Sequence, residues 1–227
     1  LDTANAIELR GDSTNRIGQT VRIIPSIDGD NLDELAISAP FFNGNRGRVF
    51  IYRGRTRAQW AAARSAMDPV SMVPFIPVSQ TTADYVINGP TTLLVSPAGN
   101  AFGQNRHGLV SAGDINADLV PDIAVPMSRG SINRYRIYSG ASIAASNGAS
   151  PLSGDTFLLE LTQTPTTDNA VTSGLGAFSF GGQNFVDSSA PDLIVGYPGG
   201  GGAGQLLVYS GPVAMAVGQP SPIAAIR

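Results

Sequence analysis

One pattern occurs three times along this chain: an acidic loop, an apolar strand, a turn rich in glycine, and a second strand that ends in Tyr-x-Gly. The acidic loop lies at residues 26–34 in the first copy and at residues 114–122 in the second. The third copy, at residues 184–192, has lost part of its acidic character. Self-similarity on this scale is the signature of a repeat architecture, so we expect one continuous array over residues 1–227 rather than separate domains.

Each copy offers four candidate β-strands. The first follows a Gly-Gln pair, and the second follows the acidic loop as an apolar run without alternation, which is typical of a strand buried on both faces. The third strand ends in the tyrosine of the motif, at Tyr52, Tyr138 and Tyr209, and a weaker fourth strand comes later. We therefore predict an all-β fold of about three four-stranded antiparallel sheets, with the copies at residues 15–90, 100–162 and 176–227.

The three tyrosines are 86 and 71 residues apart, which exceeds the roughly 40–50 residues of common four-stranded propeller repeats. Inserts account for the excess. The Ala-rich residues 57–67 predict a short helix between the third and fourth strands, whereas residues 141–151 and 212–220 predict loops in the same slot. Residues 6–10 resemble a spare outer strand. Since closure takes about four to eight blades, we predict a partial β-propeller that is completed by further sequence or by another chain.

The second acidic loop has oxygen-bearing residues at alternating positions. Calcium takes six to eight oxygen ligands in flexible geometry, while magnesium prefers rigid, water-rich octahedral sites. Asp and Asn also form ordinary turns, but recurrence of the spacing at the same point of a repeat favours a metal. We predict calcium ligands from four side chains and one main-chain carbonyl: Asp114, Asn116, Asp118, Asp122 and the carbonyl of Val120.

The first acidic loop predicts a weaker calcium site, because its first position is a neutral serine and its last is the longer glutamate. The corresponding ligands are Ser26, Asp28, Asp30, Glu34 and the carbonyl of Leu32, with Asp33 as an alternative to Glu34. The third loop retains too few charges for a metal, since it offers Asn184, Asp187, Ser188 and Asp192.

A family resemblance follows from these motifs. In the second copy, Phe102-Gly-Gln, the acidic run at residues 113–122 and Tyr138-Ser-Gly together resemble the FG-GAP repeat, the blade of the integrin alpha-subunit propeller that also occurs in bacterial secreted proteins. The resemblance extends from about residue 6 to residue 226. It implies a β-propeller, typically of seven blades, that lies outside the cell and holds calcium between the first two strands of some blades. This chain departs from it in having sequence for three blades.

Several function classes are disfavoured. The net charge is −3 and no basic patch with interleaved aromatics occurs, so we expect no nucleic-acid partner. No apolar run approaches the ~18 residues of a membrane helix, so we expect no membrane insertion. The chain has no cysteine, and its single histidine, His107, lacks a nucleophile motif, so we expect no enzyme. We interpret Arg10-Gly11-Asp12 as a chance match to the tripeptide that integrins bind, and Trp60 as a packing residue.

These observations predict a calcium-supported extracellular or cell-surface module for binding or adhesion, which contacts a protein or glycan ligand through loops at one rim. Loops on a rigid scaffold commonly carry binding. One alternative is a structural subunit of a surface assembly or appendage, completed by strand pairing with neighbouring subunits. Another is a non-catalytic propeller within a larger secreted enzyme.

Overall fold

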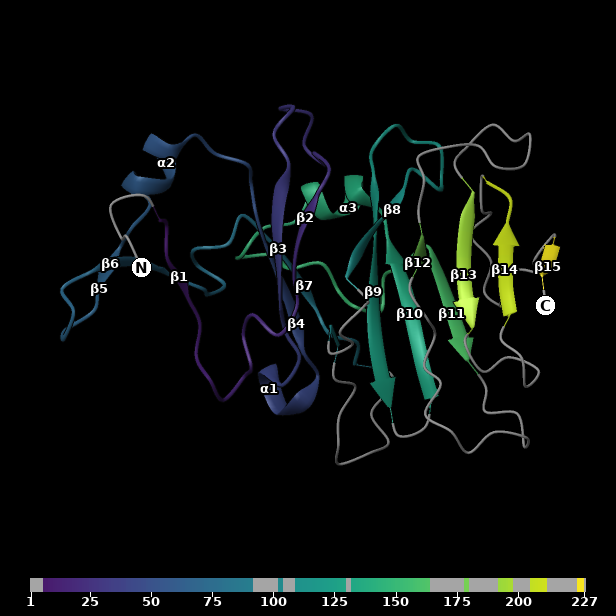
Figure 1. Cartoon of the computed structure of the whole chain (residues 1–227), viewed down its shortest axis with the longest axis horizontal. Coiled ribbons are helices and arrows are strands. Elements are labelled where there is room, and N and C mark those ends of the chain that lie inside the picture. The colour runs from purple at the N-terminus through teal and green to yellow at the C-terminus, as the bar shows by residue number, and fades with distance from the viewer. Residues whose placement is uncertain are drawn as a thin grey trace.

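The chain folds mainly into short β-strands grouped in small sheets, as a computed structural model shows (Figure 1). The structure describes residues 6–91, 102–103, 109–129, 132–163, 178–179, 192–197, 205–211 and 224–226. Within this part of the chain, no helix is both long and apolar enough to cross a bilayer.

Three four-stranded sheets follow one another in chain order. The first has the strand order β2 (Val21–Ile24), β3 (Glu34–Ala39), β4 (Arg48–Tyr52) and β7 (Tyr85–Asn88). The second contains β8 (Val110–Gly113), β9 (Asp122–Arg129), β10 (Ile132–Tyr138) and β11 (Leu159–Gln163). The third contains β12 (Phe178–Ser179), β13 (Leu193–Tyr197), β14 (Gln205–Tyr209) and β15 (Ala224–Ile226).

Every neighbouring pair within these three sheets is antiparallel, and each sheet runs in the order of its strands along the chain. The prediction of a β-rich fold with four-stranded antiparallel sheets is confirmed. In Figure 1 the sheets stand side by side as an open series, and the described strands do not close into a ring.

A smaller three-stranded sheet was not anticipated. It has the order β1-β6-β5, formed by β1 (Leu9–Arg10), β5 (Ala66–Met67) and β6 (Pro74–Pro77), and β1 pairs with β6 in parallel. The predicted spare strand at residues 6–10 therefore joins an insert that lies between β4 and β7. Figure 1 shows this sheet beside the first four-stranded sheet, on the side away from the second.

Three short helices complete the described structure: α1 (Phe42–Asn45), α2 (Arg57–Ala62) and α3 (Gly140–Ala144). The helix predicted within residues 57–67 is confirmed as α2. It begins with a reciprocal capping box between Thr56 and Gln59. The loop predicted at residues 141–151 is wrong at its start, because α3 forms there. The Ser139 hydroxyl accepts the Ser142 N–H at its first turn, and Ile143 is fully buried. Residues 212–220 lie outside the described part.

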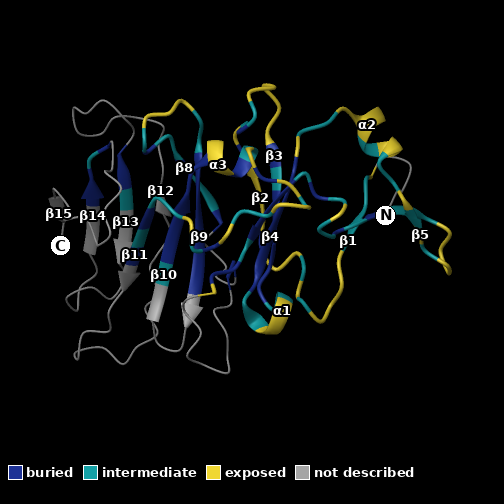
Figure 2. Ribbon diagram, turned by 180° about the vertical axis from the view of Figure 1, so that it is seen from behind, coloured by how far each residue is buried: buried dark blue, intermediate teal, exposed yellow. Residues whose placement is uncertain are grey.

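Apolar layers fill the spaces between successive sheets. One layer joins the first and second sheets, with Val49 and Ile51 of β4 against Ile123 and Val125 of β9. A second joins the second and third sheets, where Tyr135 of β10 and Leu193 of β13 belong to one cluster. A third lies between the first sheet and the three-stranded sheet with α2. Figure 2 colours β4 and the described parts of β9 and β10 mainly as buried, and the loops above the first two sheets mainly as exposed or intermediate.

Strand β4 shows why its neighbourhood is so apolar. Because successive side chains point to opposite faces, Val49 and Ile51 enter the layer toward the second sheet, while Phe50 and Tyr52 enter the layer toward the three-stranded sheet. All four side chains are buried, and full burial of such a side chain stabilises the fold by about 1.5–3 kcal/mol. The sequence predicts burial on both faces for the second strand of each copy, and β4, a third strand, is buried on both faces as well.

The glycine of the Tyr-x-Gly motif packs directly against the acidic loop. A Cβ atom on Gly140 would overlap the Pro121 carbonyl oxygen and lie 2.8 Å from Cγ1 of Val120. In the first copy, a Cβ atom on Gly54 would overlap Cβ of Leu32 and lie 2.7 Å from the Asp33 carbonyl oxygen. The motif therefore keeps glycine because the loop and the end of the third strand approach too closely for any side chain.

We expect Gly140→Ala to lower the free energy of unfolding by about 1–3 kcal/mol, because the added methyl group forces the backbone of the loop away. Ala141→Ser adds one heavy atom at the next, exposed position and is expected to change little. Chemical denaturation of the two variants and the wild type measures the difference. Equal stability of all three proteins would contradict the close packing.

Candidate metal centre

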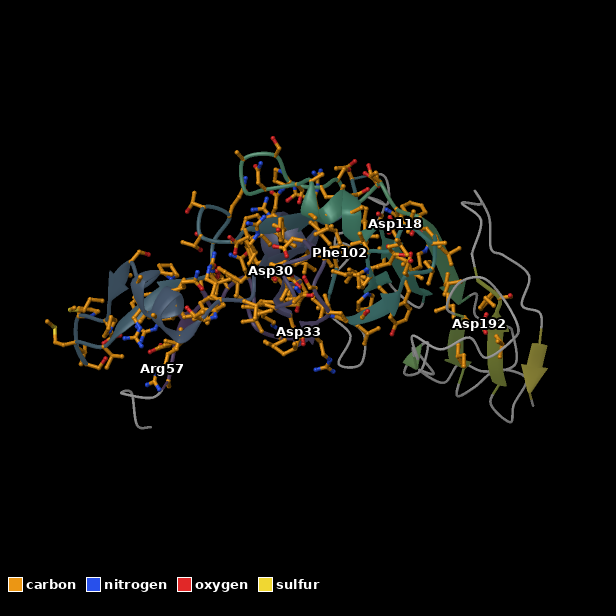
Figure 3. All side chains as sticks on the ribbon, turned by 90° about the horizontal axis from the view of Figure 1, so that it is seen from above. Asp30, Asp33, Arg57, Phe102, Asp118 and Asp192 are labelled. Atoms are coloured by element: carbon orange, nitrogen blue, oxygen red, sulfur yellow. The ribbon has the colours of Figure 1, made fainter. Side chains whose placement is uncertain are left out.

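The first two acidic loops follow the same backbone path. The loop between β2 and β3 has left-handed residues at its fourth and sixth positions, Gly29 (φ 79°) and Asn31 (φ 65°). The loop between β8 and β9 repeats this with Ala117 (φ 61°) and Leu119 (φ 70°). Both loops rise from the same edge of their sheets, the upper edge in Figure 1, which Figure 3 shows from above with Asp30 and Asp118 labelled. The sequence repeat is thus also a repeat of conformation.

The first loop brings three carboxylates together. Asp28, Asp30 and Glu34 each offer a ligand atom, and these atoms lie within 4.8 Å of one another. Backbone hydrogen bonds orient the two aspartates: Asp30 N–H donates to Oδ1 of Asp28 (3.2 Å), and Leu32 N–H donates to Oδ1 of Asp30 (2.8 Å). These three residues belong to the predicted ligand set, and they form the one such acidic group within the described residues.

Glu34 is the unusual member of the group. Its side chain is fully buried, and its Oε1 accepts a hydrogen bond from the Ile27 N–H at 3.3 Å. Its Oε2 is also buried but has no hydrogen-bond partner. Burial raises the pKa of Glu34 to about 7, and the charges of Asp28 and Asp30 act in the same direction against the hydrogen bond from Ile27. A buried carboxylate oxygen without a partner is costly unless something positive occupies the space beside it.

Asp28 is held in place by the first sheet. Its Oδ2 lies 2.9 Å from Nε of Arg53 and accepts the Tyr85 hydroxyl at 3.1 Å. The pKa of Asp28 is lowered: burial alone would raise it, but hydrogen bonds from Asp30 N–H and Tyr85, together with the Arg53 charge, outweigh burial. Ser26 donates its hydroxyl to Oδ1 of Asp28 at 3.3 Å, so this predicted ligand also lies beside the group.

The second loop uses its carboxylates differently. Both oxygens of Asp114 accept backbone N–H groups, from Asp118 (2.9 Å) and Leu119 (2.8 Å). Oδ1 of Asp118 accepts the Val120 N–H, and its Oδ2 accepts the side chains of Asn116 and Ser139. The predicted ligands of this loop are therefore bound to one another and to their own backbone. They are not drawn together as the acidic group of the first loop is.

Asp122, the last residue of the second loop, connects two parts of the sheet. Its Oδ2 accepts the Ile115 N–H (2.9 Å), and its Oδ1 accepts the Gly140 N–H (3.1 Å). Burial raises the pKa of Asp122 to about 7, against these two hydrogen bonds. Asp192 repeats the second contact, since its Oδ1 accepts the Gly211 N–H at 3.1 Å. The loop-terminal acid is therefore a structural link between the acidic loop and the glycine of Tyr-x-Gly.

This link was missed by sequence reasoning, which treated the last acid only as a metal ligand. A signal was present, because the loop-terminal acid and the Tyr-x-Gly glycine recur together in all three copies. Of the remaining third-loop residues, Asn184, Asp187 and Ser188 lie outside the described part of the chain, as does His107. The predicted carbonyl ligands of Leu32 and Val120 stay predictions.

Two further sequence features have structural explanations. In the Arg-Gly-Asp tripeptide, Arg10 forms ion pairs with Glu8 and Asp68, and Asp12 accepts the Asn15 N–H and side chain within a turn. Both charged side chains are thus committed to local contacts. Trp60 packs against the apolar layer of the first sheet, with its ring 6.1 Å from that of Tyr52, which agrees with a packing role.

Comparison with known proteins gives no relative: no family model matches the sequence, and no curated protein matches it. The resemblance to FG-GAP repeats therefore rests on the sequence motifs alone.

The left-handed conformation of Leu119 generates a test of the loop path. Leu119 is 92% exposed, so its side chain gains little from burial, while a left-handed Leu is strained. Asn tolerates the left-handed conformation and stands at the same position of the first loop. Leu119→Asn is therefore expected to stabilise the fold by about 0.5–1 kcal/mol. The measurement is the free energy of unfolding.

Val70→Asn is the matched control, because Val70 is 91% exposed and its φ is not positive. It is expected to leave stability almost unchanged. A gain of the same size in both variants would show that the effect comes from exposed hydrophobic surface rather than from the backbone.

Proposed function

We propose that Asp28, Asp30 and Glu34 bind a calcium ion in the first acidic loop. The observation that carries the proposal is Oε2 of Glu34, which is buried without a hydrogen-bond partner next to two other carboxylates. A cation there supplies the missing partner of this oxygen and relieves the repulsion between the three negative charges.

The charge balance supports a cation. Repulsion between carboxylates grows as water is excluded, because the effective dielectric constant falls. Arg53 provides a positive charge on Asp28, but no positive side chain is bonded to Asp30 or Glu34 within the described residues. A divalent ion that all three carboxylates share compensates the negative charges of Asp30 and Glu34.

The ligand chemistry favours calcium among divalent ions. The group consists of carboxylates without histidine or cysteine, and hard oxygen ligands suit calcium or magnesium rather than zinc or copper. Additional oxygens are available from the same flexible loop, at the Ser26 hydroxyl and the Leu32 carbonyl, and calcium uses such mixed sets of six to eight ligands. In the second loop, no buried carboxylate oxygen among the described residues lacks a hydrogen-bond partner as Oε2 of Glu34 does, so we propose weaker binding there.

At the level of the whole chain, we propose a non-catalytic, calcium-supported module that binds a protein or glycan outside the cell. Two observations support it: the four-stranded antiparallel sheets stack through apolar layers, as propeller blades do, and the two acidic loops share one edge of the stack (Figure 1). The likeness of the motifs to FG-GAP repeats suggests the propeller and the extracellular location. Calcium would then make rigid the edge that presents the binding loops.

Calcium is expected to raise the melting temperature relative to excess EGTA. At a calcium concentration 100 times Kd, binding stabilises the folded state by about 2.7 kcal/mol, or roughly 5–10 °C for a chain of this length. In Glu34→Gln, the apo-protein is expected to melt higher than the wild type, because no charge is buried, while calcium affinity falls at least about tenfold. Calorimetric titration and thermal unfolding measure both effects.

Glu8→Gln makes the same chemical change at a distant position and is the control for charge alone. It is expected to keep the calcium response of the wild type. Absence of a calcium response in the wild-type protein, or an unaltered response in Glu34→Gln, would contradict the proposed metal site.

One alternative function has a specific observation in its favour. β2 is an edge strand of its sheet, and it exposes two apolar side chains, Val21 (43%) and Ile23 (64%). Exposed apolar edges invite pairing with another strand, as in a structural subunit of a surface assembly. Light scattering at high protein concentration separates the two proposals, because pairing through β2 gives an oligomer that Ile23→Lys dissociates. A wild-type monomer would exclude this alternative.

A further inference from the structure

A pocket of about 350 Å³ lies between the N-terminal three-stranded sheet, helix α2 and the first four-stranded sheet. Figure 1 shows α2 and β1 standing beside that sheet. The apolar wall is formed by Ile7, Leu9, Ile23, Leu32, Leu35 and Trp60. Its volume is in the range of small-molecule sites and exceeds what a packing defect leaves in a core.

The apolar surface around this pocket is incompletely covered. Ile23 is 64% exposed and Leu32 is 43% exposed, although both belong to the pocket wall. Trp60 and Leu35 are partly buried members of the adjoining apolar layer. An apolar group that enters the pocket therefore removes several large side chains from water at once, which is favourable.

Two charged residues line the pocket, Arg55 and Asp33, and only one of them is already paired. Arg55 is already committed, because its Nη2 donates to both carboxylate oxygens of Asp84 at 2.7 Å and its guanidinium lies 4.9 Å from the centre of the Trp60 ring. Asp33 is exposed, and within the described residues its carboxylate has no hydrogen-bond or ion-pair partner. The pocket thus joins an apolar wall to an unpaired negative charge.

We propose that this pocket binds an apolar amine, that is, an aliphatic or aromatic group that carries a positively charged nitrogen. The apolar body lies against Trp60 and Leu35, and the ammonium group pairs with Asp33 at the mouth. Charge complementarity selects the cation, since Asp33 is the acidic residue of the pocket lining and Arg55, the basic one, is already paired with Asp84. Asp33 lies outside the three-carboxylate group, but it is the neighbour of Glu34, and Leu32 belongs both to the pocket wall and to the proposed calcium ligands, so binding of the amine is tested without calcium.

Trp60 is the single tryptophan of the chain, so its fluorescence reports on the pocket. The probes are cyclohexylmethylamine and cyclohexylacetate, which share an apolar body, carry opposite charges and do not absorb with tryptophan. Titrations of the full chain are made with EGTA present, so that they do not depend on the metal. We expect a saturable change with the amine and at least about tenfold weaker binding of the carboxylate.

Asp33→Asn is expected to weaken binding of the amine at least about fivefold, while binding of the carboxylate stays the same or becomes tighter. Ile23→Ser, at an exposed position, is expected to weaken both probes by a similar factor. Asp12→Asn makes the same change as Asp33→Asn in a turn that does not line the pocket and should alter neither. Equal affinities of the two probes in the wild type, an unchanged ratio in Asp33→Asn, or no saturable response to either probe would overturn the proposal.

The amine can be a free small molecule or the N-terminus of a peptide, and a second pair of probes distinguishes these sources. The peptide Phe-Gly-Gly amide is compared with its N-acetylated form, which lacks the positive charge. Binding of the free peptide at least about tenfold tighter than cyclohexylmethylamine identifies a peptide N-terminus. Binding no tighter than the simple amine identifies a small amine, and preference for the acetylated form would contradict the role of Asp33.

Discussion

Burial of both faces of the central strands in the first two sheets is the constraint on which this structure depends. Val49 and Ile51 on one face of β4, and Phe50 and Tyr52 on the other, require apolar partners on both sides of the first sheet. A single sheet of this kind cannot be stable alone, because it would expose a full apolar face to water. The repeated sheets therefore stabilise one another in series, and each of the first two acidic loops is positioned by a strand that is fixed on two sides.

The acid that ends the loop differs by one methylene group between the two copies: it is Asp122 in the second and Glu34 in the first. The shorter side chain is a structural link, and the longer one is a candidate metal ligand. Asp122 ends its loop with both oxygens bonded to backbone N–H groups, one of them the Gly140 N–H. Glu34 occupies the same place in the first copy, where Oε1 has a backbone partner and Oε2 has none. The repeat thus keeps an acid at one position for folding, and a small change of side-chain length leaves an oxygen available for a cation.

The fold was largely predictable from sequence, because hydrophobic runs, turn residues and the Tyr-x-Gly motif all report on local structure. The four strands of the first two copies, the last three of the third copy and the helix near Trp60 were found in this way. The first strand of the third copy was expected after the Gly-Gln pair at residues 182–183, whereas β12 (Phe178–Ser179) lies before that pair. The loop predicted at α3 was wrong, since the Ser139 cap and the buried Ile143 act over too few residues to show a helical period. The three-stranded sheet was missed because β1 and β5 have two residues each. In the metal loops, counting charges favoured Asp114 and Asp118, but a count does not show that Glu34 keeps one buried oxygen without a hydrogen-bond partner.

The three-stranded sheet has a consequence for how such an array can grow. It covers the face of the first four-stranded sheet that points away from the second, and two of its strands are inserted between β4 and β7. Any further sheet that stacked on this face of the first sheet would have to displace the three-stranded sheet or pack against its outer side.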